Sequence, residues 1–160
     1  MTLAYVALGA NLGDPVATVE AALAALKALP QTMLLAVSSL YRTTPVGLKD
    51  QPDFINAVAA LDTELTPAAL LEELFAIEAR FGRQRSVRNA PRTLDLDLLL
   101  HGDTRSDHPA MILPHPRMHE RAFVLTPLAE IAPELMLPGH GAVTVLRDQC
   151  QDQGITRLTP

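Results

Sequence analysis

Two aspartates separated by a single residue are the side chains in this sequence best suited to chemistry. Asp95 and Asp97 stand in the stretch TLDLDLLL at positions 93–100. Side chains alternate along a β-strand, so both carboxylates would share one face, about 7 Å apart, with leucines 94, 96, 98 and 100 on the other. Two like charges beside an apolar core are costly unless a cation neutralises them, and Mg²⁺ accepts carboxylates together with water and substrate phosphates. The pattern predicts a Mg²⁺ site, and solvated aspartates on an open sheet face are the alternative.

A cluster of arginines directly precedes the two aspartates. The chain has two lysines and eleven arginines, and five of these arginines fall between positions 80 and 92, a stretch without an acidic residue: Arg80, Arg83, Arg85, Arg88 and Arg92. Guanidinium groups match phosphate oxygens with two parallel hydrogen bonds. The cluster and the aspartates together predict a phosphoryl-transfer site, in which a metal screens the phosphates and arginines stabilise the developing charge. The other interpretation of the arginines is a solvated helix end and loop.

The composition and the missing motifs narrow the class of protein. The net charge of −5 argues against broad binding to nucleic acid or to anionic membranes. No apolar run approaches the roughly 20 residues of a membrane-spanning helix, and no export signal precedes the first apolar stretch. The single Cys150 cannot form an internal disulfide, so a reducing, cytoplasmic location is expected. Neither a P-loop nor the protein-kinase motifs occur, so ATP must be held by another scaffold.

The elements that would position these residues follow from periodicity and turn signals. Strands are expected at 4–9, 33–41, 54–65 and 93–100, and helices at 16–29, with Asp14 as N-cap, and at 67–81, with Thr66 as N-cap. A long ordered loop covers 42–53, and a further helix 117–132, while the segment beyond Pro138 is expected to be strand and loop. The βαββαβ order predicts an α+β, ferredoxin-like sandwich with helices on one face of an antiparallel sheet, and residues 1–160 are expected to form one domain.

Several motifs together resemble a known family. The run PRTLDLDL at 91–98, preceded by Gly82-Arg83, looks like the signature of 6-hydroxymethyl-7,8-dihydropterin pyrophosphokinase, an enzyme of folate biosynthesis. Further motifs occur in the family's order: ALGANLGD at 7–14, SLYRT at 39–43, QPDFINA at 51–57, and PHPRM with RAF at 114–123. Any one would be weak, but their common order covers most of the chain. The resemblance implies transfer of pyrophosphate from ATP to the hydroxymethyl group of the pterin, with AMP as the second product.

The resemblance also implies roles for individual residues. Asp95 and Asp97 would bind two Mg²⁺ ions, and Arg83, Arg92 and Asp97 would be catalytic. The pterin would be bound by Thr43, Pro45, Val46, Phe54, Asn56 and Phe123, with the two phenylalanines sandwiching its ring. ATP would be bound by Glu78, Arg83, Arg85, Arg92, Leu98, His115 and Arg121. The expected partners are these small molecules alone, without nucleic acid or membrane, and the expected state is a monomer.

Two other functions remain open on the residues themselves. A nucleotidyltransferase would also place an Asp-x-Asp strand beside a glycine turn, but it would release pyrophosphate in place of AMP. An RNA-binding module of the same βαββαβ order would need aromatic residues on its central strands and a basic sheet face. The fourth strand carries aspartates instead, and aromatic residues make up 4% of the chain.

Overall fold

The computed structural model describes residues 1–45, 51–82, 94–150 and 154–158. The larger elements are strands β1 (Thr2–Ala10), β2 (Thr32–Val37), β3 (Tyr41–Thr43), β4 (Phe54–Thr63) and β5 (Asp95–His101), and helices α1 (Pro15–Lys27), α2 (Pro67–Arg80) and α3 (Ala122–Ile131). The smaller ones are β6 (Ser106–His108), β7 (Met111–Leu113), the 3₁₀ turn η1 (Met118–Glu120), β8 (Met136–Leu137), β9 (Gly141–Ala142), α4 (Val143–Gln149) and β10 (Ile155–Arg157). None of the described helices is both long and apolar enough to span a membrane.

The central sheet is antiparallel and runs in the order β10-β3-β4-β1-β5, with β2 also paired to β4. In chain order, β1, α1, the pair β2 and β3, β4, α2 and β5 give the ferredoxin-like βαββαβ arrangement, in which α1 and α2 connect strands of the sheet. The predicted fold class is therefore confirmed. Both predicted helix caps are present. The side chain of Asp14 accepts a hydrogen bond from Ala17 N at 3.2 Å, and Thr66 accepts one from Ala69 N at 3.1 Å.

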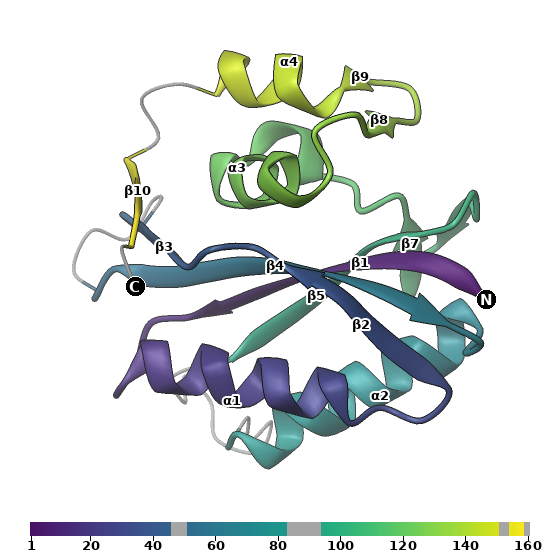
Figure 1. Ribbon diagram of the computed structural model, residues 1–160, viewed down its shortest axis with the longest axis horizontal. Helices are drawn as coiled ribbons and strands as arrows, with labels where there is room; N and C mark the ends of the chain where they lie inside the picture. The colour runs from purple at the N-terminus through teal and green to yellow at the C-terminus, as the bar shows by residue number, and fades with distance from the viewer. Residues whose placement is uncertain (46–50, 83–93, 151–153, 159–160) are drawn as a thin grey trace.

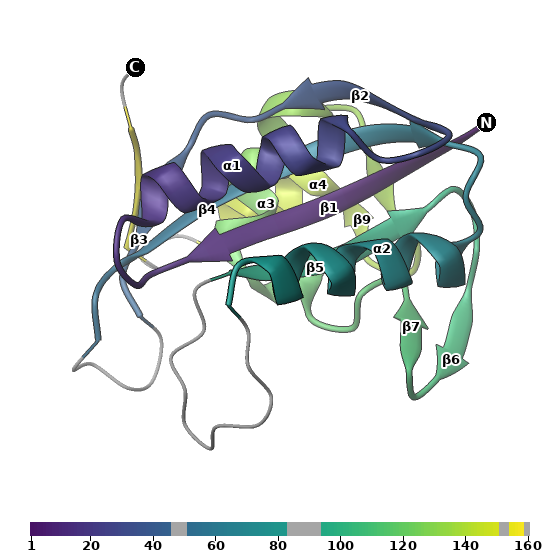
Figure 2. The same ribbon diagram turned by 90° about the horizontal axis from the view of Figure 1, so that it is seen from below.

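Helices cover both faces of the sheet, not one as the sequence suggested (Figure 1). Helices α1 and α2 lie together on one face, as Figure 2 shows from below, while α3 and α4 lie on the other. The strands are apolar on both sides, because Val6 and Leu8 enter the core under α1 and α2, while Tyr5 and Val58 enter the core under α3. A sheet that is apolar on two faces must bury both of them.

Several predicted segments differ in detail. The helix expected at 117–132 is the 3₁₀ turn η1 followed by α3, and helix α4 forms beyond Pro138, where strand and loop were expected. The strand expected at 33–41 divides into β2 and β3, because Ser38 interrupts the ladder: its hydroxyl oxygen accepts from Val58 N at 2.9 Å. In β5, Leu100 does not share a face with Leu96 and Leu98, since the register against β1 shifts between Tyr5 and Val6 and turns Leu100 into the core under α3. A bulge of this kind is invisible to a simple period of two.

Candidate active site

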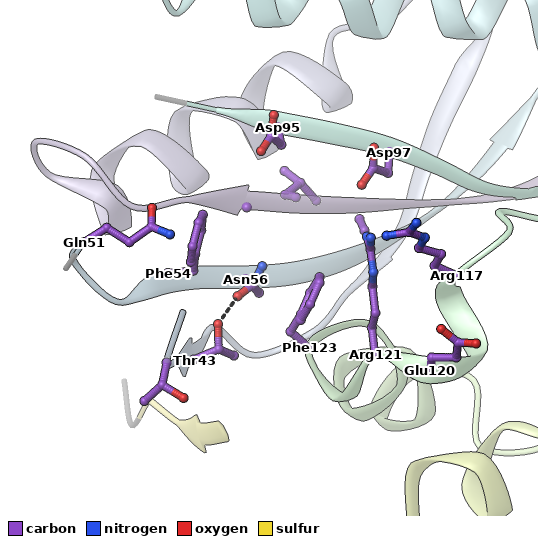
Figure 3. Close-up of a pocket in the computed structure, with 14 residues that line it drawn as sticks. Thr43, Gln51, Phe54, Asn56, Asp95, Asp97, Arg117, Glu120, Arg121 and Phe123 are labelled. Atoms are coloured by element: carbon purple, nitrogen blue, oxygen red, sulfur yellow. Dashed lines mark hydrogen bonds between the residues drawn. The ribbon is translucent and has the colours of Figure 1, made fainter. Parts of the chain in front are cut away.

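The two aspartates lie on the face of β5 that looks toward α3. Asp95 and Asp97 are both partly exposed, whereas Leu96 between them is 3% exposed. The ladder places Gly9 of β1 opposite Asp95, and Ala7 opposite Asp97. The small residues on β1 leave open space beside the carboxylates, and Figure 3 shows both carboxylates on the rim of this space.

Gly9 is required by the close approach of Asn56. On its other side Gly9 pairs with Asn56 of β4, and a Cβ atom added at Gly9 would lie 2.9 Å from Asn56 Nδ2. That separation is shorter than a carbon and a nitrogen atom tolerate, so any larger residue would displace the Asn56 amide. Gly9 therefore lies within β1 and forms the floor between Asp95 and Asn56.

The side-chain amide of Asn56 has a fixed orientation. The Thr43 hydroxyl donates to Asn56 Oδ1 at 2.7 Å, and both residues are almost fully buried. With its oxygen occupied by Thr43, the amide directs its NH₂ group toward Gly9 and the open space, as Figure 3 shows. The floor thus presents hydrogen-bond donors to anything bound there.

Two aromatic rings border the same open space. Phe54 begins β4, and Phe123 lies in the first turn of α3; neither is fully buried. Figure 3 shows the two rings on either side of Asn56. The guanidinium carbon of Arg121 lies 5.4 Å from the centre of the Phe123 ring, within the range of a cation–π contact.

These groups enclose a pocket of about 770 Å³, here called the floor pocket. It is lined by Ala7, Leu8, Gly9, Thr43, Thr44, Gln51, Phe54, Asn56, Asp95, Asp97, Arg117, Glu120, Arg121 and Phe123. Gln51 is linked to the β1–α1 turn, because Asn11 Nδ2 donates to Gln51 Oε1 at 3.0 Å. The pocket is therefore apolar where Phe54 and Phe123 line it and polar at the floor around Asn56. The aspartates of β5 make one side acidic, and the arginine at the start of α3 makes the opposite side basic.

A second, smaller pocket adjoins the first on the far side of the aspartates. This helix-side pocket has a volume of about 460 Å³ and is lined by Phe75, Glu78, Asp95, Leu96, Asp97, His115 and Arg121. Glu78 of α2 is 3% exposed and accepts a hydrogen bond from Leu96 N at 3.0 Å, which ties α2 to β5. Both pockets are lined by Asp95, Asp97 and Arg121, so the two pockets adjoin at the carboxylates.

His115 presents a neutral imidazole to the helix-side pocket. Burial lowers the pKa of His115 below the ordinary imidazole value of 6.5; Asp97 opposes this effect, and the positive charges of Arg121 and Arg117 add to it. The ring Nδ1 accepts a hydrogen bond from Arg117 N at 3.2 Å, so the proton of the neutral ring belongs on Nε2. His115 follows a cis peptide bond between Leu113 and Pro114, and its own amide donates to Leu99 O.

The structure brings together most of the described residues that the sequence singled out. Thr43, Phe54, Asn56 and Phe123 line the floor pocket, Glu78 and His115 line the helix-side pocket, and Asp95, Asp97 and Arg121 line both. Two expected residues line neither pocket: Pro45 is half-buried beyond Thr44, and Leu98 is 5% exposed in the core under α1 and α2. The side-chain alternation that selects Asp97 places Leu98 on the opposite face. Val46, Arg83, Arg85, Arg88 and Arg92 lie outside the described residues.

Apart from residues of β1 and β5 that line the pockets (Ala7, Leu8, Gly9 and Leu96), sequence reasoning missed four residues of the floor pocket and one of the helix-side pocket. Thr44, Gln51, Arg117 and Glu120 line the floor pocket, and Phe75 lines the helix-side pocket. Gln51 and Arg117 belong to motifs noted above, whereas η1, which brings Glu120 to the site, gives no periodic signal in three residues. No cluster of three metal-ligating His, Cys, Asp or Glu side chains occurs among the described residues.

Comparison with known proteins agrees with this geometry. Residues 5–133 match the model of the family described as 7,8-dihydro-6-hydroxymethylpterin-pyrophosphokinase. The 2-amino-4-hydroxy-6-hydroxymethyldihydropteridine pyrophosphokinase of Pseudomonas aeruginosa is 52% identical over 154 residues, which cover 96% of this chain and 95% of that protein. The protein of the same name from Haemophilus influenzae is 46% identical over 160 residues, 100% of both chains.

Solved structures share the fold at low sequence identity. A crystal structure of HPPK-DHPS in complex with substrates superposes with a TM-score of 0.78 at 12% identity, covering 99% of this chain and 47% of that chain. A Plasmodium falciparum HPPK-DHPS variant with pterin and p-hydrobenzoate gives a TM-score of 0.76 at 13% identity, covering 98% and 47%. This chain thus spans about half of those solved chains. From the family match and the identity to the bacterial relatives, the chain belongs to the 7,8-dihydro-6-hydroxymethylpterin-pyrophosphokinase family.

Proposed function

We propose that the two pockets hold the two substrates of the family's reaction, and that the transfer takes place at the aspartates between them. The reaction passes a pyrophosphoryl group from ATP to 6-hydroxymethyl-7,8-dihydropterin and yields the pterin diphosphate and AMP. The observation that carries this proposal is that Asp95 and Asp97 line both pockets. A group that moves between two bound molecules must pass through the space that both pockets share.

The floor pocket suits the pterin. A flat heterocycle can stack between Phe54 and Phe123, which stand on either side of the floor (Figure 3). The NH₂ group of Asn56, held by Thr43, can then donate to an acceptor on the edge of the ring. The proposed transfer requires that the hydroxymethyl group of the stacked ring then faces Asp95 and Asp97.

The helix-side pocket suits the nucleotide. Arg121 and the Nε2–H of His115 supply donors for phosphate oxygens, while Phe75 and Glu78 line the part nearer α2. Arg83, Arg85 and Arg92, outside the described residues, belong to the segment that joins α2 to β5, and Glu78 near the end of α2 and Asp95 at the start of β5 both line this pocket. We infer that Arg83 and Arg92 stabilise charge on the transferred phosphates, and that Pro45 and Val46 contribute backbone contacts to the pterin.

The aspartate pair fits Mg²⁺. The two carboxylates share one strand face and open into both pockets, and hard oxygen ligands are what this ion prefers. In the described part of the chain no third His, Cys, Asp or Glu joins them, which leaves coordination positions for water and phosphate oxygens. When bound there, two Mg²⁺ ions would supply charge neutralisation for the polyphosphate and lower the pKa of the attacking hydroxyl.

The chain's own residues position an in-line displacement. The pterin hydroxymethyl oxygen forms a bond to the β-phosphorus of ATP, and the bond from that phosphorus to the oxygen bridging the α-phosphate breaks, so that AMP leaves with that oxygen. Asp97 accepts the proton of the attacking hydroxyl. Arg121 and His115 hold the triphosphate in line, and orientation of this kind accounts for a large part of the rate of phosphoryl transfer.

The state of the whole protein is part of this proposal. We infer that residues 1–160 act as one pyrophosphokinase domain, monomeric and cytoplasmic. Size-exclusion chromatography with light scattering would test whether the protein is a monomer.

Two competing functions can be compared with this site. The nucleotidyltransferase would release pyrophosphate, and the RNA-binding module would need aromatic residues where β5 carries aspartates. Family membership favours neither.

The decisive experiment identifies the nucleotide product. The protein is incubated with ATP, Mg²⁺ and the reduced pterin, and the products are separated by chromatography. We expect AMP in amounts equal to the pterin diphosphate, and its loss in Asp97→Ala. The control is Asp107→Ala, which removes an exposed aspartate on β6 outside both pockets. Release of pyrophosphate, or full turnover by Asp97→Ala, would contradict the proposal.

A further inference from the structure

The carboxylate of Glu130 joins three separate segments of the chain. Glu130 lies near the end of α3 and accepts two hydrogen bonds from Ser39 N, at 3.0 Å to each oxygen, and one from Ser39 Oγ at 2.9 Å. The buried Tyr41 hydroxyl donates to Glu130 Oε1 at 2.6 Å. Arg157 Nη2 of β10 lies 3.8 Å from Glu130 Oε2. None of these four residues lines either pocket.

The charge state of this cluster favours a strong bond. Burial by itself raises the pKa of Glu130, but the donors of Tyr41 and Ser39 and the charge of Arg157 outweigh it and lower that pKa below its ordinary value. Burial, the hydrogen bond to Glu130 and its negative charge raise the pKa of Tyr41 to about 12. At neutral pH the contact is therefore a phenol donating to an ionised carboxylate, which is stronger than a bond between neutral groups.

Helix α3 carries both Glu130 and one aromatic side of the floor pocket. Phe123 is in its first turn, and Glu130 follows seven residues, or about two turns, later, which places both on one side of the helix. Whatever fixes Glu130 against the sheet therefore also fixes the position of Phe123.

The partners of Glu130 are neighbours of the residues that line the other side of the floor pocket. Tyr41 pairs with Asn56 across the β3–β4 ladder, and Thr43, at the end of β3, pairs with Phe54 and holds the Asn56 amide. Ser39 lies in the connection that leads from β2 into β3. The Glu130 contacts thus join α3, which carries Phe123, to β3, and β3 in turn pairs with β4, which carries Phe54 and Asn56. The arrangement of α3, β3 and β4 can be followed in Figure 1.

We propose that Glu130 is a positioning residue for the pterin: by tying α3 to β3 it sets the separation between Phe123 and the surface formed by Phe54 and Asn56. The proposal rests on the proposed assignment of the floor pocket to the pterin. It predicts a larger effect on the pterin than on ATP, because the helix-side pocket is built mainly from α2, β5 and His115, and Arg121 is its only lining residue at the start of α3 among the described residues. A loss of general stability would affect both substrates.

The test compares the two substrates in two matched variants. Glu130→Gln keeps the shape of the side chain and removes its charge, and Tyr41→Phe removes only the donor. In each we expect the KM for the pterin to rise roughly fivefold to tenfold, as loss of one charge-assisted hydrogen bond implies, while kcat and the KM for ATP stay within about twofold of the parent values. Because Tyr41 acts through Glu130, the two substitutions should raise the KM for the pterin less than additively in the double variant.

A control and a direct binding measurement complete the test. Asp107→Asn removes the charge of an exposed carboxylate on β6, outside both pockets, and should change neither KM. The chain has no tryptophan, so the fluorescence anisotropy of an oxidised hydroxymethylpterin reports its binding with little background. Thermal melts establish that each variant is folded, and if Glu130→Gln is not, Tyr41→Phe decides.

The outcomes separate this proposal from the assigned function. If the parent protein forms no AMP from ATP and the pterin, the proposed function is wrong. If the parent is active and the folded variants bind the pterin as tightly as it does, Glu130 has no positioning role. A parallel rise in the KM of both substrates would likewise reduce Glu130 to a general structural contact.

Discussion

At the scale of single residues, the Thr43–Asn56 hydrogen bond decides what the floor of the pocket can recognise. An asparagine amide offers a donor end and an acceptor end, and the Thr43 hydroxyl occupies the acceptor. The donor end remains for the ligand. A pterin that presented only donors at that edge would leave two sets of N–H groups facing each other.

Thr43→Val should weaken pterin binding. Valine has the shape of threonine but no hydroxyl, so Asn56 Oδ1 would be buried without its donor, which costs roughly 1–3 kcal/mol, or at least about fivefold in affinity. Titration with the pterin in the presence of a non-hydrolysable ATP analogue would measure this change. Thr43→Ser retains the hydroxyl and should bind nearly as the parent does; equal binding by the valine and serine variants would show that the bond is unimportant.

Gly9→Ala should be more damaging than its single added carbon suggests. Its Cβ would lie 2.9 Å from Asn56 Nδ2, and the amide can move only by lengthening its 2.7 Å contact with Thr43. We expect a higher KM for the pterin in steady-state assays. Gly13→Ala is the contrasting variant: nothing lies within 4 Å of a Cβ at Gly13, so a loss there reflects its φ of 65° and should lower stability rather than selectivity.

The sequence predicted the chemistry of the site better than its full extent. Asp95 and Asp97 could be found because alternation in a strand is a local rule, and Asn56 stands out because strands seldom contain asparagine. Arg117 and Glu120 could not be found in that way, since their positions depend on how η1 packs against α3 and α4. Leu98 was selected by resemblance, although alternation alone turns its side chain away from the pockets.

At the scale of elements, local sequence signals predicted the helices correctly where the helix is long and has a side-chain cap. Both α1 and α2 begin at the predicted Asp14 and Thr66 caps. The seven-residue helix α4 was missed because it is too short to show a period and lacks a side-chain cap. The division between β2 and β3 was missed because it depends on the Ser38 hydroxyl replacing a backbone partner across the ladder, which is a long-range contact.

The Thr66 cap offers a prediction at this scale. Thr66→Ala removes the acceptor for Ala69 N and should lower the free energy of unfolding by about 1 kcal/mol. Urea denaturation would measure the loss, and Thr66→Ser should restore most of it. Because α2 carries Glu78 into the helix-side pocket from its other end, we expect kcat under saturating substrates to remain unchanged in the folded variant; a large drop would indicate that the cap also orients Glu78.

At the scale of the whole molecule, stability should depend on pH through the contact between Tyr41 and Glu130. The pKa of Tyr41 is raised to about 12, so the folded protein keeps a proton that the unfolded chain releases near the ordinary value of 10.0. This contribution is complete below pH 10 and is lost as the pH rises toward 12. The pKa of Glu130 is lowered, so its contribution is present above the ordinary value of 4.5 and is lost as the pH falls through the lowered value.

Thermal melts across the pH range would detect both limits. The parent should lose melting temperature between pH 10 and 12 more steeply than Tyr41→Phe, in which no phenol titrates at that position. On the acid side, Glu130→Gln should show a shallower decline than the parent. Identical slopes for parent and variant on both sides would indicate that other groups control the pH dependence.

The pairing of β10 with β3 determines when the pocket can be completed during synthesis. Ile155 lies opposite Thr43, and Thr44 N donates to Gly154 O. Strand β10 therefore supports β3, whose Thr43 fixes the Asn56 amide. More than a hundred residues of sequence separate these partners. A nascent chain will therefore have its central ladder of β1 and β4 available well before this edge is in place, and competence to bind the pterin tightly should arise only after residues 154–158 have emerged from the ribosome.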